Sequence, residues 1–119
     1  CDIINKSGAD MVISIHQNSY VTPKAEGAQI FYYKKSEESK RIAQIMQGIL
    51  GEKLGTTRQI KSDVNYYILL HSKLPTIISE CGFLSNPEEE QKLCTEEYQE
   101  KVADALYCGI IEYLMMNMK

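Results

Sequence analysis

The chain has 119 residues, of which 44% are hydrophobic, and its 13 basic and 16 acidic side chains give a net charge of −3. These figures are typical of a globular domain, and they argue against a disordered chain, a coiled coil or a basic nucleic-acid-binding surface. No apolar stretch reaches the roughly 18 residues that a membrane span requires. We therefore expect a single domain over residues 1–119.

The first elements that the sequence predicts are strands. Residues 9–16 contain a β-branched apolar run, residues 28–33 are rich in aromatic side chains, and residues 74–79 are a shorter apolar run. Continuous apolar runs of this length are typical of strands that are buried on both faces. Residues 64–70 fit either a further strand or a short helix.

Helices are predicted between and after these strands. Apolar residues recur at three- and four-residue steps over residues 37–54, and Gly55 closes this helix. Asn86 followed by Pro87 marks a second helix start, and Thr95 caps a third helix that extends towards the C-terminus. Alternating strands and helices indicate the α/β class, here a mostly parallel twisted sheet flanked by helices.

Two of the predicted strands end in ionisable side chains. His16 follows the apolar run 11–15, and Glu80 follows residues 76–79. Each alone is explained as well by a satisfied histidine or an exposed acid at a strand end. However, open α/β sheets bind ligands at the carboxyl ends of their strands, and a carboxylate is costly to bury unless it is paired, metal-bound or solvated. If the two strands are parallel neighbours, both side chains face one crevice, so we predict a shared site.

A histidine and a glutamate fit zinc hydrolysis, in which imidazole binds the metal and a carboxylate transfers protons. A catalytic zinc needs three protein ligands, and spacing alone allows a set of His16, His71 and Glu80, although ordinary strand-end histidines are commoner than ligands. Nucleophilic arrangements have less support, because Ser79 alternates to the opposite side of its strand from Glu80 and Cys81 has no histidine partner implied. The four cysteines match no metal or redox spacing, so we expect free, mostly buried thiols.

Three segments resemble the motifs of one enzyme family. Residues 9–19, ADMVISIHQNS, resemble the "AD-apolar-apolar-SIH-x-N" motif of the zinc-dependent N-acetylmuramoyl-L-alanine amidases of the amidase-3 type. Residues 27–33, GAQIFYY, are similar to the family's "GAQ-x-FYY" strand, and residues 75–89 are similar to its "P-apolar-E-x-GFLSNP-x-E" signature. Residues 55–58 and the GAQ strand look most like the sporulation members, which trim spore cortex.

The resemblance implies a reaction, namely hydrolysis of the amide between the lactyl group of N-acetylmuramic acid and L-alanine in peptidoglycan. His16 matches a zinc-binding histidine of the family, and Glu80 matches the glutamate taken as general acid/base. Asn18, just past the metal ligand, either lines the substrate cleft or caps a loop. His71 matches no ligand, so the resemblance removes it from the set that spacing allowed.

In the family, the first strand carries another histidine ligand, and the helix that follows it carries a glutamate ligand. Neither has a counterpart in this sequence, which starts at Cys1. We therefore expect the C-terminal portion of an amidase domain, lacking the N-terminal strand and helix, with two further Zn²⁺ ligands upstream of Cys1. This portion alone is expected to be inactive. The alternative is a non-catalytic peptidoglycan-binding or regulatory module that has lost its metal site.

The resemblance also implies partners and a location. Peptidoglycan glycan strands with stem peptides are the expected substrate, nucleic acid is not expected, and an accessory protein is compatible with the family. Because peptidoglycan lies outside the membrane, we expect an extracytoplasmic protein of the cell wall or of the forespore intermembrane space.

Overall fold

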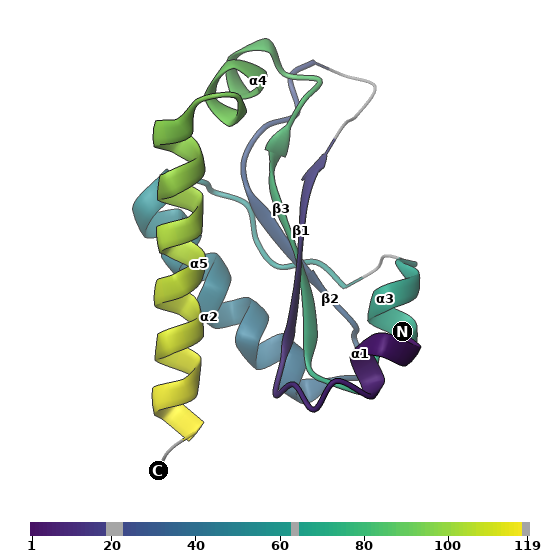
Figure 1. Cartoon of the computed structure of the whole chain (residues 1–119). Coiled ribbons are helices and arrows are strands. Elements are labelled where there is room, and N and C mark those ends of the chain that lie inside the picture. The colour runs from purple at the N-terminus through teal and green to yellow at the C-terminus, as the bar shows by residue number, and fades with distance from the viewer. Residues whose placement is uncertain (19–22, 63–64, 118–119) are drawn as a thin grey trace.

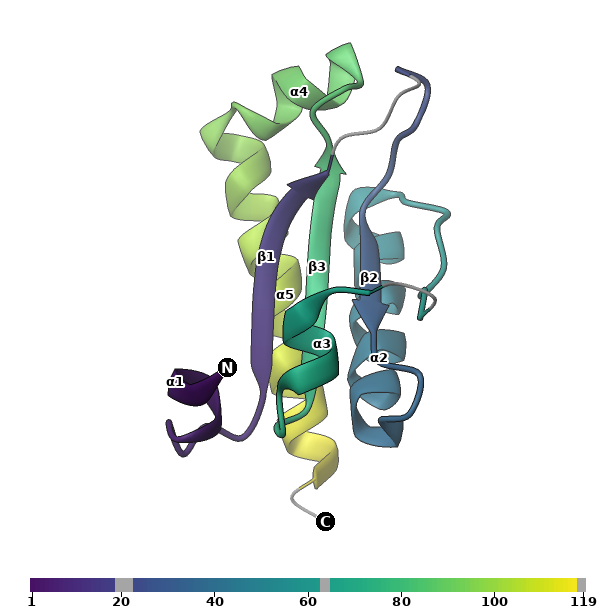
Figure 2. The same ribbon diagram turned by 90° about the vertical axis from the view of Figure 1, so that its right-hand side faces the viewer.

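The computed structural model describes residues 1–18, 23–62 and 65–117. Its strands are β1 (Val12–Asn18), β2 (Gln29–Tyr32) and β3 (Thr76–Phe83). They form one sheet in the order β1–β3–β2, in which β1 runs parallel to β3 and β2 runs antiparallel to it. Figure 2 shows that β1 and β3 point towards the same end of the molecule. The first and last predicted strands are therefore parallel neighbours.

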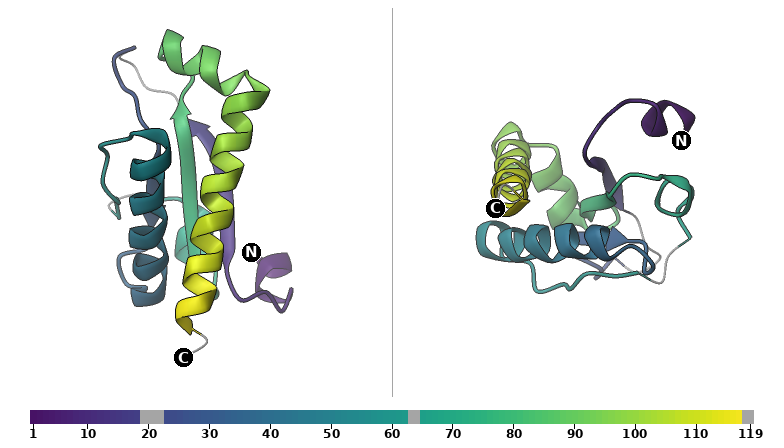
Figure 3. Two further views of the ribbon diagram at one scale, coloured as in Figure 1. Left: turned by 90° about the vertical axis from the view of Figure 1, so that its left-hand side faces the viewer. Right: turned by 90° about the horizontal axis from the view of Figure 1, so that it is seen from below.

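The helices cover the two faces of the sheet unequally. The long helices α2 (Glu37–Leu54) and α5 (Glu96–Asn117) lie together on one face, as Figure 1 and the left view of Figure 3 show. The short helices α1 (Asp2–Asn5) and α3 (Tyr67–His71) lie on the other side. Helix α4 (Pro87–Leu93) follows the carboxyl end of β3.

Helix α2 brings the main core together on its side of the sheet. Its fully buried residues Ile42, Met46 and Leu50 recur at four-residue steps and pack with Ile30 of β2 and Ile77 of β3. A smaller cluster of Phe31, Leu69 and Ile78 fills the other face beneath α3. All eight residues of β3 are buried, which explains why its apolar residues do not alternate with exposed polar ones.

The predicted helix ends are confirmed. The Ser36 hydroxyl accepts a hydrogen bond from the Ser39 amide at the start of α2, and Gly55 ends this helix with a φ of 76°, in the left-handed region that favours glycine. The Asn86 side chain accepts from two amides of the first turn of α4. The Thr95 hydroxyl accepts from the Tyr98 amide at the start of α5.

Within residues 64–70 the short helix is confirmed and the strand is wrong. Residues 67–70 belong to α3, in which Leu69 is buried and Ile68 is half-buried, whereas Tyr67 and Leu70 are exposed. A strand would bury every second residue, but here the two inward-facing side chains are adjacent. Packing on the Phe31 and Ile78 side chains of the sheet decides the conformation, because only a helical turn directs both of these side chains there.

The α/β class is confirmed, and the described sheet has one parallel and one antiparallel pairing. An antiparallel strand at the edge of an otherwise parallel sheet is common in α/β folds. In the described residues β1 pairs on one side only, with β3. None of the described helices is both long enough and apolar enough to cross a bilayer.

Candidate active site

His16 and Glu80 meet at the carboxyl end of the parallel strands. The β1–β3 register places His16 directly beside Glu80, so their side chains leave the sheet on the same face. The two differ in burial, because His16 is exposed whereas Glu80 keeps only 3% of its surface accessible. The structure thus brings together the two residues that strand-end chemistry singled out.

Glu80 is a buried acid with little to stabilise its charge. Its Oε1 accepts a hydrogen bond of 3.4 Å from the Tyr66 hydroxyl, and its Oε2 has no hydrogen-bond partner among the described residues. Burial raises the pKa of the carboxyl above its usual value, an effect that the His16 charge and the Tyr66 hydrogen bond oppose. A carboxyl group in this state takes up and releases protons closer to neutral pH than an exposed glutamate does.

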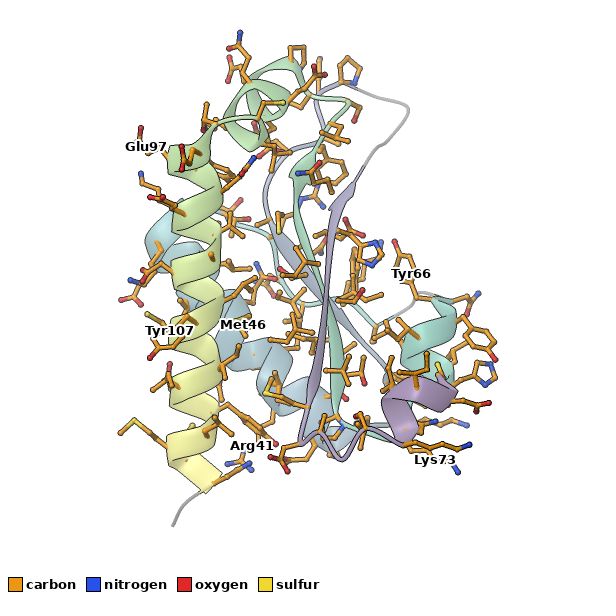
Figure 4. All side chains as sticks on the ribbon, viewed as in Figure 1. Arg41, Met46, Tyr66, Lys73, Glu97 and Tyr107 are labelled. Atoms are coloured by element: carbon orange, nitrogen blue, oxygen red, sulfur yellow. The ribbon has the colours of Figure 1, made fainter. Side chains whose placement is uncertain are left out.

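Tyr66 is a site residue that the sequence analysis did not identify. It precedes α3, its ring stacks on Phe31 at 5.8 Å between centroids, and it lies 6.4 Å from the His16 ring. Figure 4 places it on the side of the sheet away from α5. Burial and the Glu80 charge raise the pKa of its phenol, so it stays a hydrogen-bond donor. Tyr66 reaches the site because it directly precedes α3. The sequence of residues 64–70 fitted either a strand or a short helix, so it did not predict this position.

The imidazole of His16 is held from its own strand. Its Nε2 lies 2.7 Å from the Ser14 hydroxyl, two residues earlier on the same face of β1. Because a hydroxyl can donate or accept, this contact orients the ring in either neutral tautomer. The rest of the ring stays exposed at the sheet edge, where an incoming group can reach it.

The end of β3 is anchored by a second glutamate, Glu89 of α4. Its carboxylate accepts hydrogen bonds from the Phe83 amide at 2.9 Å and from the Gly27 amide at 3.0 Å. These two amides belong to the end of β3 and to the segment that enters β2. Glu89 therefore ties β3, the strand that carries Glu80, to the segment that enters β2, a role that its place in the signature did not reveal.

The other predicted candidates have separate outcomes. His71 is not at this site, because its ring stacks on Tyr67 at 4.1 Å and its carbonyl accepts from Asn5, which precedes β1. The zinc set that spacing alone allowed is therefore wrong. Ser79 is fully buried on the face opposite Glu80, as alternation predicts. Asn18 pairs through its backbone with Phe83, and its side chain lies outside the described part of the structure.

The sequence analysis predicted free, mostly buried thiols, and the burial part of this prediction is wrong, because Cys94 is exposed and Cys1 and Cys108 are half-buried. All four cysteines are free. Cys81 is buried, and burial raises the pKa of its thiol. A neutral buried thiol is a poor nucleophile, which agrees with the absence of an assigned histidine partner.

A metal fits this site only in part. The exposed imidazole of His16 is a suitable zinc ligand, and the unpartnered Oε2 of Glu80 lies on the same face. Among the described residues, however, no three histidine, cysteine, aspartate or glutamate side chains are grouped closely enough to hold a metal. The described residues therefore offer one candidate ligand and one candidate proton-transfer group, but not a complete zinc site.

Sequence comparisons place these motifs in a known family. Residues 1–112 match the Amidase_3 family, described as N-acetylmuramoyl-L-alanine amidase. The chain is 41% identical over 112 residues to the germination-specific N-acetylmuramoyl-L-alanine amidase of Bacillus subtilis, which covers 93% of this chain and 47% of that protein. It is 30% identical over 115 residues to the amidase LytC of the same organism, covering 92% of this chain and 23% of LytC.

Solved structures share the fold. The CwlD amidase of Clostridioides difficile, solved in complex with the GerS lipoprotein, matches with a TM-score of 0.92 and 39% identity over 97% of this chain and 59% of that chain. The catalytic domain of CwlV from Bacillus (Paenibacillus) polymyxa matches with a TM-score of 0.87 and 31% identity, covering 95% and 62%. This chain therefore spans less than two thirds of each of these relatives, and it belongs to the N-acetylmuramoyl-L-alanine amidase family.

Proposed function

We propose that the intact protein hydrolyses the amide between the lactyl group of N-acetylmuramic acid and L-alanine in peptidoglycan. The observation that carries this proposal is the placement of Glu80, a buried acid with a raised pKa beside His16 at the carboxyl edge of the sheet. Family membership supports the same reaction. The 41% identity to a germination-specific amidase supports a role in spore cortex.

Glu80 is the proposed general acid/base. Its Oε2, which has no partner among the described residues, takes a proton from the attacking water while the new bond to the carbonyl carbon forms. The same carboxyl then gives the proton to the amide nitrogen as the carbon–nitrogen bond breaks, which leaves a carboxylate on the lactyl group and releases the stem peptide with a free amino group on its L-alanine. The raised pKa suits this role because the acid must hold the proton between the two steps.

His16 is the proposed zinc ligand of this chain, with the two remaining ligands upstream of Cys1. A bound zinc ion would lower the pKa of a water and polarise the scissile carbonyl. His16 meets the needs of a ligand because its ring is accessible and is oriented by Ser14. Asn18, two residues beyond His16 in sequence, is proposed to line the substrate cleft.

The activity is tested with purified peptidoglycan and mass spectrometry of the released stem peptides. We expect Glu80→Gln in the intact protein to lower kcat by about 10²–10⁴-fold, the usual contribution of a general acid/base. Glu97→Gln, an exposed glutamate of α5, is the matched control and should leave turnover unchanged. Binding of peptidoglycan without any turnover by the wild type would support the non-catalytic module instead.

Zinc content tests the ligand separately. We expect the intact protein to hold one zinc ion and His16→Ala to lose it, because a three-ligand site does not hold its metal tightly with two. His71→Ala is the matched control, since this histidine stacks on Tyr67 and contributes nothing to the site. Full zinc occupancy in His16→Ala would contradict the assignment. The 119-residue chain alone should bind zinc weakly and show no turnover.

The proposed substrate also sets the location and the partners. A protein that acts on peptidoglycan works outside the cytoplasmic membrane, and kinship with a germination-specific amidase points to the forespore intermembrane space. The relative CwlD was solved with a lipoprotein bound. We therefore include an accessory protein among the partners of the intact enzyme, to be tested by affinity purification from sporulating cells.

A further inference from the structure

The segment after α2 delivers an arginine to the edge of the site. Beyond Gly55 the chain turns back along β2, as Figure 2 shows. Thr56 bonds the Ala28 carbonyl, and Lys61 exchanges two backbone hydrogen bonds with Ile30 and Tyr32 at 3.1 Å each. These contacts fix both ends of a short span whose centre is Arg58.

Three contacts hold the Arg58 guanidinium. Its Nε donates to the Glu26 carbonyl at 2.5 Å, and its Nη1 donates to the Gln29 side-chain oxygen at 3.2 Å. Its central carbon lies 4.7 Å from the centre of the Phe83 ring. A guanidinium has five N–H donors, so three stay available, and no acidic side chain among the described residues forms an ion pair with it.

The guanidinium lies on the same face as Glu80. Gln29 pairs directly with Glu80 across the β2–β3 ladder, so their side chains leave the sheet on one side. Phe83 pairs with Asn18 after a register shift, at the same end of the sheet as His16. Arg58 contacts both Gln29 and Phe83 and therefore borders the crevice that contains the two proposed active-site residues.

The distance between Glu80 and the Arg58 guanidinium suits a substrate group that lies one or two residues from the scissile bond. Paired residues of an antiparallel ladder are about 5 Å apart, and the Gln29 side chain with its hydrogen bond lengthens this path to roughly 10 Å. An extended peptide covers about 3.4 Å per residue, so the guanidinium is within reach of the residue or two that follow L-alanine. Planar N–H pairs of arginine bind carboxylates in a bidentate manner.

We propose that Arg58 binds the free α-carboxylate of the stem-peptide residue that follows L-alanine, and so selects stems in which this carboxylate is not amidated. The inference rests on the proposed function. The buried Phe83 ring shields one side of the guanidinium from water, which strengthens the attraction to an anion. Gln29 and the Glu26 carbonyl fix the direction of the free N–H groups.

The test compares two substrates with the intact enzyme, muropeptides with D-glutamate or with D-isoglutamine at the second stem position. We expect the wild type to have a KM at least about tenfold lower for the D-glutamate form, the scale of one charge-assisted hydrogen-bond pair. Arg58→Gln should raise KM for the D-glutamate form and remove the preference, with kcat almost unchanged. Arg41→Gln, at the only other arginine, should preserve the preference.

Two results would overturn the inference: no substrate preference in the wild type, or an equal loss on both substrates in Arg58→Gln, which would mean that Arg58 only braces Glu26 and Gln29. If the wild type cleaves neither substrate, the proposed function fails, and the carboxylate site at Arg58 is then tested by binding alone. Calorimetry with the same two muropeptides then applies. Tighter binding of the D-glutamate form that is lost in Arg58→Gln supports the carboxylate site, and equal affinities refute it.

Discussion

Replacement of Glu80 by glutamine should make the metal-free protein more stable, although it removes the proposed acid/base. The wild-type carboxylate is 3% exposed and accepts a single long hydrogen bond of 3.4 Å, so its charge is poorly compensated. Glutamine keeps the shape and the oxygen that faces Tyr66 but carries no charge. An unsatisfied buried polar atom costs about 1–3 kcal/mol, and the glutamine NH₂ keeps part of that cost. We expect a net gain of about 1 kcal/mol, in the range typical of active-site replacements that stabilise.

The gain should depend on pH in a defined direction. The pKa of Glu80 is raised in the folded state from a reference value of 4.5. Below that value both folded and unfolded chains carry the protonated acid, so wild type and variant should be equally stable. As the pH rises, the unfolded chain ionises first, and the wild type loses stability until the folded carboxyl has also ionised. The difference should therefore be near zero at pH 4 and constant well above the raised pKa.

Urea unfolding with EDTA present, at pH 4 and pH 8, measures this difference. A gain of 1 kcal/mol corresponds to a rise of about 3–5 °C in Tm for a domain of this size, which scanning calorimetry can check. Glu97→Gln should change stability by less than about 0.5 kcal/mol at either pH. If Glu80→Gln were no more stable than wild type at pH 8, Glu80 would not be the uncompensated buried charge that the geometry indicates.

Three further predictions concern the frame around the site. Glu89→Ala should lower the free energy of unfolding by about 2–4 kcal/mol, because two amides lose a charged acceptor. Glu89→Gln should lower it by about half as much, and equal losses for the two variants in urea unfolding would contradict this. Gly109→Ala places a methyl group against Met46 and should cost about 1–3 kcal/mol, and less in a Met46→Leu background, by the same measurement. Iodoacetamide should label Cys94 on the order of 10² times faster than Cys81, as peptide mass spectrometry would show, because Cys81 is buried with a raised thiol pKa.

Much of the architecture was predictable because local and tertiary preferences agree. Ser36 and Gly55 bound α2 through contacts that involve only neighbouring residues, so sequence pattern alone finds its ends. The strand character of residues 76–79 follows from burial on both faces, which leaves adjacent apolar residues instead of an alternating pattern. In each case the sequence pattern that predicts the element lies in the residues that form it.

The rest depended on distant contacts. Residues 67–71 became a helix because Leu69 and Ile68 pack on side chains of β2 and β3, which lie far away in sequence. The antiparallel direction of β2 likewise depends on its pairing with β3, which is distant in sequence, and a strand's own residues do not encode its direction. Composition and periodicity therefore gave the elements but not the arrangement of the sheet.

The candidate site divides in the same way. His16 and Glu80 were predictable because an ionisable group after an apolar strand is conspicuous, and the parallel register then joins them. Tyr66 and Arg58 were not assigned roles, because each lies in an irregular segment that the fold carries back to the sheet. Side chains that support or border a site from connecting segments leave no periodic signal.

Glu80 and Glu89 show how one signature uses two glutamates in opposite ways. Glu89 accepts hydrogen bonds from the backbone amides of two segments, so its charge is satisfied and it fixes the end of β3. Glu80 lies on the central strand, where neighbours on both sides bury it, and among the described residues only the Tyr66 hydroxyl donates a hydrogen bond to its carboxylate. Because β3 is held firmly by Glu89, Glu80 cannot turn towards solvent to relieve its burial without disrupting the strand. The satisfied glutamate thereby keeps the unsatisfied one in the buried state that the proposed proton transfer requires.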